Sequence, residues 1–258
     1  MSERRVDVDL TAREGGTVAR LTIDNRAKLN TLDSALMRDI VAAVDALGRR
    51  DDLRALIVTG AGEKAFIGGA SINEMAELDP QSARAFITLV HETCDAFRRL
   101  PVPVIARIDG FALGAGLEVA VSCDLRIAST RAKLGMPEVR VGLPSVVEAA
   151  LIPQLIGFGR AREFLMLGET IDADTALRWG LVERVVAPEA LDAEIERVLD
   201  SLLAGGPLAM RRQKSLMQAW ERLPIDEAIA AGVDAFEATF TAEEPRRMLS
   251  AFVSRKQR

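Results

Sequence analysis

Histidine and cysteine are scarce in this chain, and their scarcity limits its chemistry. The 258 residues include one histidine, His91, and two cysteines, Cys94 and Cys123. His91 and Cys94 lie three positions apart, but one such pair lacks the further ligands that a zinc site needs, so we expect no metal. Both cysteines fall within apolar patterns, which predicts buried, reduced thiols and a reducing compartment rather than a disulfide.

Long apolar runs and basic clusters are also missing. No segment approaches the ~20 apolar residues of a membrane span, and the opening MSERRVDVDL lacks the apolar core of a signal peptide. The net charge is −5 and the pI is near 5.2, with no basic block before the C-terminus. A nucleic-acid surface needs a concentrated basic patch. We therefore expect a cytoplasmic protein that binds neither a membrane nor nucleic acid.

A serine-hydrolase arrangement is not indicated either. The chain has no G-x-S-x-G motif, in which a strained turn exposes a nucleophilic serine. The single histidine lies in a helical pattern, where such a residue is more often structural than catalytic. We therefore do not assign His91 as a catalytic base.

The composition itself is typical of a soluble globular protein. Hydrophobic residues make up 49% and charged residues 28% of a chain long enough for one large domain or a core with an appendage. No internal repeat or low-complexity segment is evident, and Gly205-Gly206-Pro207 is the clearest break. We predict a core over residues 1–204 and a C-terminal helical region over residues 205–258.

Strand and helix patterns alternate along the predicted core. Residues 18–24 and 54–60 are apolar and β-prone, and between them apolar residues keep helical spacing from Asp33 to about Gly48. This alternation indicates an α/β fold with a largely parallel sheet and helical crossovers. Further helices are expected over residues 81–100, 158–167, 172–179 and 188–203, and after residue 208.

The stretch from Val104 to Leu125 contains the clearest candidate site. An apolar strand leads into a glycine-rich loop, and we expect a helix to begin near Ala115. The first N–H groups of a helix have no partner within it and attract negative charge, so an oxyanion could sit there. Glu118 lies three residues further on, on the same helix face. The stretch thus places an acid/base group beside an anion site.

This stretch resembles the signature of the enoyl-CoA hydratase/isomerase family, the crotonases. In that family a strand leads to a G-x(3)-[AG](3) loop, a helix and a Cys-Asp pair. The resemblance extends from about Val18 to Lys256. It implies the crotonase (ClpP/crotonase-like) fold, an α/β spiral of β-β-α units with a C-terminal helical region. The signature positions are filled by Gly110, Gly114, Ala115, Gly116, Cys123 and Asp124.

A second segment, Lys64 to Met75, resembles the first oxyanion loop of crotonases. Through that resemblance, the backbone N–H groups of Ala70 and Ala115 are the two donors to a thioester oxygen. Backbone donors do not depend on the side chain, so alanine at position 115 is compatible with this role although relatives often have glycine there. Ser71 stands where many members have aspartate.

The resemblance also implies how the substrate and the subunits are held. Coenzyme A belongs to the substrate, so no separate cofactor is implied. Lys28 has the charge to pair with one of its phosphates. The C-terminal region implies a homo-oligomer, either a trimer or a dimer of trimers. The implied coenzyme A-binding residues are Ala27, Lys28, Leu29, Gly68, Ala70, Ser71, Ile72, Asn73, Gly114, Phe252 and Lys256.

Glu138, which follows Pro137, is the second candidate catalytic carboxylate. In the family, a carboxylate at this point faces the glutamate of the glycine-rich helix across C2 and C3 of the substrate. Hydration needs one group to take a proton from water and another to deliver one to C2. By resemblance, Glu118 holds and activates the water and Glu138 donates the proton. Two carboxyls in one apolar pocket do not readily both ionise, which suggests a shared proton.

One segment departs from the family pattern. Many hydratases have a glycine-rich stretch after this carboxylate, whereas residues 142–148 of this chain read GLPSVVE. The segment borders the acyl pocket in the family, so the acyl specificity stays open. Glu148 is either a third active-site group or, as we predict, a first-turn helix residue with Ser145 as its N-cap.

We predict an enoyl-CoA hydratase that adds water to a trans-2-enoyl-CoA to give the 3-hydroxyacyl-CoA. The alternative within the family is a Δ3-Δ2 enoyl-CoA isomerase, in which the Glu118 position is commonly not acidic. Other enolate reactions, namely thioester hydrolysis, decarboxylation or retro-aldol cleavage, also remain open. A non-catalytic or RNA-binding role is disfavoured by the paired glutamates and by the low pI.

Overall fold

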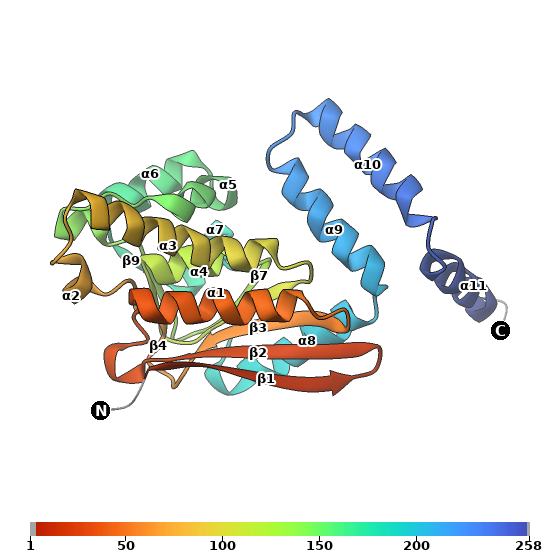
Figure 1. Cartoon of the computed structure of the whole chain (residues 1–258), viewed down its shortest axis with the longest axis horizontal. Helices are drawn as coiled ribbons and strands as arrows, with labels where there is room; N and C mark the ends of the chain where they lie inside the picture. The colour runs from red at the N-terminus through yellow and green to blue at the C-terminus, as the bar shows by residue number, and fades with distance from the viewer. Residues whose placement is uncertain (1–3, 257–258) are drawn as a thin grey trace.

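Two β-sheets organise the molecule, for which a computed structural model describes residues 4–256 (Figure 1). The larger sheet has the order β1-β2-β3-β5-β7-β10 and the smaller one β4-β6-β8-β9. Only the β1–β2 and β8–β9 pairs in these sheets are antiparallel. The strands are β1 (Arg5–Arg13), β2 (Gly16–Asp24), β3 (Leu53–Gly60), β4 (Ala65–Ile67), β5 (Val104–Ile108), β6 (Phe111–Leu113), β7 (Leu125–Ser129), β8 (Lys133–Gly135), β9 (Thr170–Asp172) and β10 (Arg184–Val186).

The chain visits the two sheets in a repeating order. β3 of the larger sheet is followed by β4 of the smaller one, β5 by β6, and β7 by β8, and each pair leads into helices. This confirms the predicted spiral of β-β-α units, and the larger sheet is parallel from β2 to β10. The strands of the smaller sheet were not expected individually, because three residues are too few to show an alternating pattern.

Most helices lie where apolar spacing and turn residues indicated, but the helix over residues 152–156 was not expected. The α-helices are α1 (Ser34–Gly48), α2 (Ile72–Met75), α3 (Pro80–Arg99), α4 (Ala115–Ser122), α5 (Ile152–Ile156), α6 (Phe158–Leu167), α7 (Ala173–Trp179), α8 (Leu191–Leu203), α9 (Pro207–Trp220), α10 (Ile225–Thr239) and α11 (Glu244–Lys256). The short 3-10 helices are η1 (Arg26–Lys28), η2 (Glu138–Val141), η3 (Val147–Leu151) and η4 (Pro188–Ala190).

Helices cover both faces of the larger sheet. All eight residues of β3 are buried, as expected for a parallel strand with helices on either side. α1, α3 and α4 pack on one face in the main apolar core, and α8 covers the other face (Figure 1). The N-terminus of α1 is fixed by Asp33, whose side chain accepts a hydrogen bond from the Leu36 N–H.

The last three helices extend away from this core. α9 and α10 pack side by side, and α11 lies at the far end of the molecule (Figure 1). A buried cation ties α9 to the core: Lys214 Nζ donates to the carbonyls of Phe97 and Val102 and, at 2.7 Å, to the carboxylate of Asp124. Within residues 4–256, none of the helices combines the length and apolar character needed to traverse a bilayer.

Gly116 marks the closest approach between α4 and β4. A Cβ at this position would lie 2.1 Å from the carbonyl oxygen of Ile67, a backbone atom that cannot move aside alone. Only glycine therefore allows α4 to pack this tightly on the smaller sheet. The spacing of the two elements depends on this one residue.

Gly116→Ala is therefore expected to lower the free energy of unfolding by about 1–3 kcal/mol, the usual cost of overpacking. Gly159→Ala on α6 is the matched control, because a Cβ there meets nothing within 4 Å and alanine favours the helix, so the stability should not fall. Urea denaturation of both variants measures the difference. Equal losses would contradict the proposed close contact.

Candidate active site

An apolar cleft of about 200 Å³ lies where the ends of three neighbouring strands meet. β4, β6 and β8 run parallel, so the segments that follow them emerge at one edge of the smaller sheet. These segments carry Ala70, then Ala115 and Glu118, then Glu138, all of which line the cleft. The fold thus brings together the four residues that the sequence predicted as catalytic centre.

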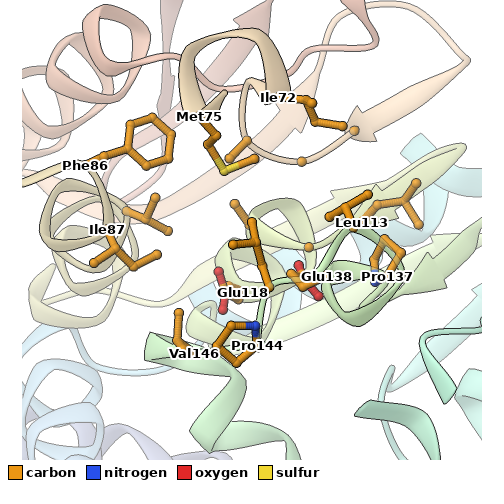
Figure 2. Close-up of a pocket in the computed structure, with 18 of the residues that line it drawn as sticks. Ile72, Met75, Phe86, Ile87, Leu113, Glu118, Pro137, Glu138, Pro144 and Val146 are labelled. Carbon is orange, nitrogen blue, oxygen red and sulfur yellow. The ribbon is translucent and has the colours of Figure 1, made fainter. Parts of the chain in front are cut away.

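The two carboxyl groups occupy the middle of the cleft. Figure 2 shows Glu118 and Glu138 side by side, with Phe86, Ile87 and Met75 on one flank and Leu113 on the other. The remaining predicted residues on the cleft wall are Gly68, Gly114 and Ile72.

The backbone at Ala70 is directed away from its neighbouring segment. Leu32 forms an isolated parallel bridge with Ala70, donating to the Gly69 carbonyl at 2.9 Å and accepting from the Ser71 N–H at 2.7 Å. In a parallel bridge, one residue bonds the two neighbours of its partner, and the partner's own N–H points away from the bridge. The Ala70 N–H therefore faces away from Leu32, on a residue that lines the cleft.

Ala115 is the first residue of α4, so its N–H has no acceptor within the helix. Gly114 precedes it with φ +50 and ψ −123, a backbone conformation that favours glycine. A Cβ at Gly114 would also lie 2.4 Å from Glu138 Oε1. Glycine here thus serves both the turn into the helix and the space for the second carboxyl.

Glu118 is buried within a helix whose eight residues are all buried. Burial, followed by the negative charges of Glu138 and Glu148, raises the pKa of Glu118 to about 8, and a hydrogen bond from the Ala149 backbone partly opposes this shift. A pKa one unit above neutral corresponds to about a tenfold excess of the protonated form at pH 7. Glu118 thus carries a proton under neutral conditions.

Glu138 is half-buried at the start of η2, where it is open to a substrate. Its Oε2 accepts a hydrogen bond of 2.8 Å from the Ser145 hydroxyl. The expectation that Ser145 caps a helix is wrong: Val146 is the N-cap residue of η3 and makes no side-chain capping bond. Ser145 binds the candidate catalytic carboxyl instead, because the chain turns back over the cleft before η3 begins.

The predicted coenzyme A loop lies on the surface next to the Gly68 segment. Ala27, Lys28 and Leu29 are exposed, and the Leu29 carbonyl accepts from the Gly68 N–H at 2.8 Å. Ile72 and Asn73 are exposed on α2. The side chain of Ser71 accepts a hydrogen bond from the Glu74 N–H, so it caps α2.

Phe252 and Lys256 lie on α11, away from the cleft of their own chain (Figure 1). Phe252 is exposed, and the side chain of Lys256 lies outside the described part of the structure. A single chain does not bring these two positions to the coenzyme A loop. Their predicted role requires a neighbouring copy.

Sequence reasoning missed most of the apolar residues of the cleft wall. Phe86, Ile87 and Val90 of α3 line the cleft, but their helical spacing is also that of ordinary core residues. Pro144 and Val146 belong to the segment whose departure from the family pattern was noted, and both line the cleft. Among residues 4–256, no group of three or more His, Cys, Asp and Glu side chains is placed to hold a metal ion.

The spiral fold and the paired carboxyls between two loops define a crotonase-type enzyme. Comparison with known proteins identifies the family: the enoyl-CoA hydratase/isomerase family matches residues 13–258. The chain therefore belongs to the enoyl-CoA hydratase/isomerase family.

The alignments with individual relatives extend over nearly the whole chain. The short-chain-enoyl-CoA hydratase of Clostridium acetobutylicum is 35% identical over 242 residues, covering 93% of each protein. The crotonyl-CoA hydratase of Syntrophomonas wolfei is 35% identical over 240 residues, covering 93% of this chain and 92% of the relative. The crystal structure of enoyl-CoA hydratase from Bacillus anthracis superposes with a TM-score of 0.92 at 29% identity, covering 97% of this chain and 96% of that one.

The raised pKa of Glu118 is directly measurable. The carboxyl carbon of Glu118, assigned in carbon-13 NMR by its loss in Glu118→Gln, is expected to titrate with a midpoint of about 8. A midpoint near the ordinary value of 4.5 would show that the carboxyl is solvated.

The same shift predicts how stability depends on pH. Because the folded-state pKa lies above the unfolded value, the contribution of Glu118 to stability is complete below about pH 4.5 and is lost as the pH rises through 8. Urea denaturation between these pH values should show a downward slope for the natural protein that Glu118→Gln reduces. Identical slopes would contradict the assignment.

Proposed function

We propose that the protein hydrates a trans-2-enoyl-CoA to the 3-hydroxyacyl-CoA. The observation that carries this proposal is the pair of carboxyls, Glu118 and Glu138, facing one apolar cleft from two different elements. Hydration needs two such groups around one water, whereas a Δ3-Δ2 isomerase needs one carboxyl to shuttle a proton. The relatives support an enzyme of the hydro-lyase type.

The thioester oxygen would bind between the backbone N–H groups of Ala70 and Ala115. As water attacks C3, electron density moves through the conjugated system onto this oxygen, giving an enolate. Two fixed N–H donors in an apolar cleft stabilise that charge without reorganisation. Removing one donor of this kind typically costs about 10²–10³-fold in rate.

The carboxyl pair completes the addition. Glu118 takes a proton from the water as its oxygen bonds to C3, and Glu138 delivers a proton to C2, so the pair exchanges one proton and remains singly protonated overall. In the free enzyme burial favours the proton on Glu118. Because both carboxyls face one cleft, this proton can pass to Glu138 before the water attacks, which leaves Glu118 as the base.

The substrate would enter with its coenzyme A part outside the cleft. Ala27 to Leu29 and the Gly68–Asn73 segment provide an exposed rim for the adenosine end, and Lys28 would pair with a phosphate. The small apolar cleft favours a short acyl chain without charged groups. Crotonyl-CoA is therefore the first substrate to test.

Loss of the conjugated-thioester absorbance of crotonyl-CoA measures the activity. Glu118→Gln and Glu138→Gln keep size and hydrogen bonding but remove the titratable proton, so each should lower kcat/KM by about 10²–10⁴-fold. Glu163→Gln on the exposed side of α6 is the control and should retain full activity. Full activity in either cleft variant would refute the assigned role.

We also propose that the region 205–258 joins copies of the chain into a trimer or a dimer of trimers. α10 exposes a stripe of apolar side chains at helical spacing, which within one chain is left in water. The stripe consists of Ile225, Ile229, Val233, Phe236 and Phe240.

A charge in this stripe should break the assembly. Ile229→Glu is expected to reduce the mass measured by light scattering to that of a smaller species, because a carboxylate would be buried at the contact. Ala230→Glu, on the adjoining face with Asp226 and Asp234, is the control and should leave the mass unchanged. A monomeric natural protein would refute the proposed assembly.

A further inference from the structure

One short segment, residues 145–149, contacts both candidate catalytic carboxyls. The Ser145 hydroxyl donates to Glu138, and the Ala149 backbone, whose N–H donates to the Val146 carbonyl, lies close enough to the carboxyl of Glu118 to lower its pKa. Val146 lies between them on the cleft wall. The position of this segment therefore sets the position of both carboxyls.

The segment is held from behind by Glu148. This side chain is 6% exposed and does not line the cleft; it lines a separate hollow together with His91, Arg98 and other charged side chains. Its Oε1 lies 2.7 Å from Nδ1 of His91 on α3. Since a carboxylate only accepts hydrogen bonds, Nδ1 carries the hydrogen when Glu148 is ionised.

The second oxygen of Glu148 is unsatisfied. Oε2 is buried and has no hydrogen-bond partner among the described residues. Burying a charged oxygen without a partner is costly, so a carboxylate kept in this state requires an explanation.

The backbone next to Glu148 is also strained. Val147 has φ +43, in the left-handed region that β-branched residues avoid. Such a conformation persists only when the contacts on either side impose it. Here those contacts are Val146 in the cleft wall and the buried Glu148 with its bond to His91.

We propose that Glu148, held by His91, is a positioning residue that fixes the 145–149 segment against both catalytic carboxyls and keeps one proton between them. This inference rests on the proposed function for the identity of the catalytic pair. Glu148 acts through its anchoring bond and through its negative charge behind Glu118. It does not touch the substrate.

The electrostatic part follows from the surroundings of Glu148. Burial and the charge of Glu138 are the two larger causes of the raised pKa of Glu118, and the charge of Glu148 is the third. Burial and, after it, the charge of Glu148 also raise the pKa of the Cys94 thiol. Arg98 and Glu221 form an ion pair at the hollow and largely offset each other. The titratable and charged groups that face Glu148 or Glu118 are His91, Cys94, Asp95 and Arg98 on α3, Glu118 on α4, Glu138 on η2, and Glu221 and Arg222 after α9.

Glu148→Gln tests this role because glutamine retains the size and the acceptor for His91 but lacks the charge. Titration of the Glu118 carboxyl by carbon-13 NMR, without substrate, should show its midpoint move down from about 8 by about one unit. The alkaline limb of kcat/KM for crotonyl-CoA should move with it. An unchanged midpoint in the folded variant would overturn the proposal.

If Glu148→Gln does not fold, variants of His91 provide a second test. The His91 side chain is half-exposed, so replacing it should not prevent folding. His91→Ala removes the anchor and should lower the midpoint, whereas His91→Asn restores an N–H donor and should retain it. Equal midpoints in both variants would overturn the proposal. Because the titration uses no substrate, failure to hydrate crotonyl-CoA would refute the proposed function while leaving this result interpretable.

Discussion

The burial of the Glu118 carboxyl at the start of α4 is the constraint on which the site depends. An ionised carboxylate surrounded by apolar residues is so costly that the group takes up a proton instead. That burial exists only because α4 lies directly on β4, an approach that Gly116 permits. Packing of a glycine in the core thus determines the protonation of a group in the cleft.

The spiral topology explains why distant residues meet. Three successive β-β-α units of the spiral each contribute one short strand to the smaller sheet, and these strands lie side by side in parallel. The segments after them therefore emerge next to one another, although Ala70 and Glu138 are far apart in the sequence. The edge of the sheet thus fixes where each of these segments begins.

The sequence predicted those parts of the fold that have a local pattern. Apolar spacing gave α1, α3 and α6 closely, and the glycine-rich loop located the start of α4 at Ala115. The carboxyl pair followed from the family resemblance rather than from spacing alone. The family match and the similar structures confirm that resemblance.

Features that depend on tertiary contacts could not be predicted in this way. Serine is a common N-cap residue, yet Ser145 binds Glu138 because the chain folds back over the cleft. Glu148 lies in the first turn of a helix, η3, as predicted, but no local pattern reveals that His91, on another helix, lies 2.7 Å from it. The apolar residues of α3 in the cleft wall follow the same spacing as those in the core, so periodicity cannot separate them.

Mass spectrometry of the product formed from crotonyl-CoA in heavy-oxygen water tests the central claim most directly. Hydration by the carboxyl pair predicts a 3-hydroxyacyl-CoA that carries the label on C3, with the thioester intact. Label in a free carboxylic acid would indicate thioester hydrolysis. Either that result or unlabelled, unchanged crotonyl-CoA would contradict the account.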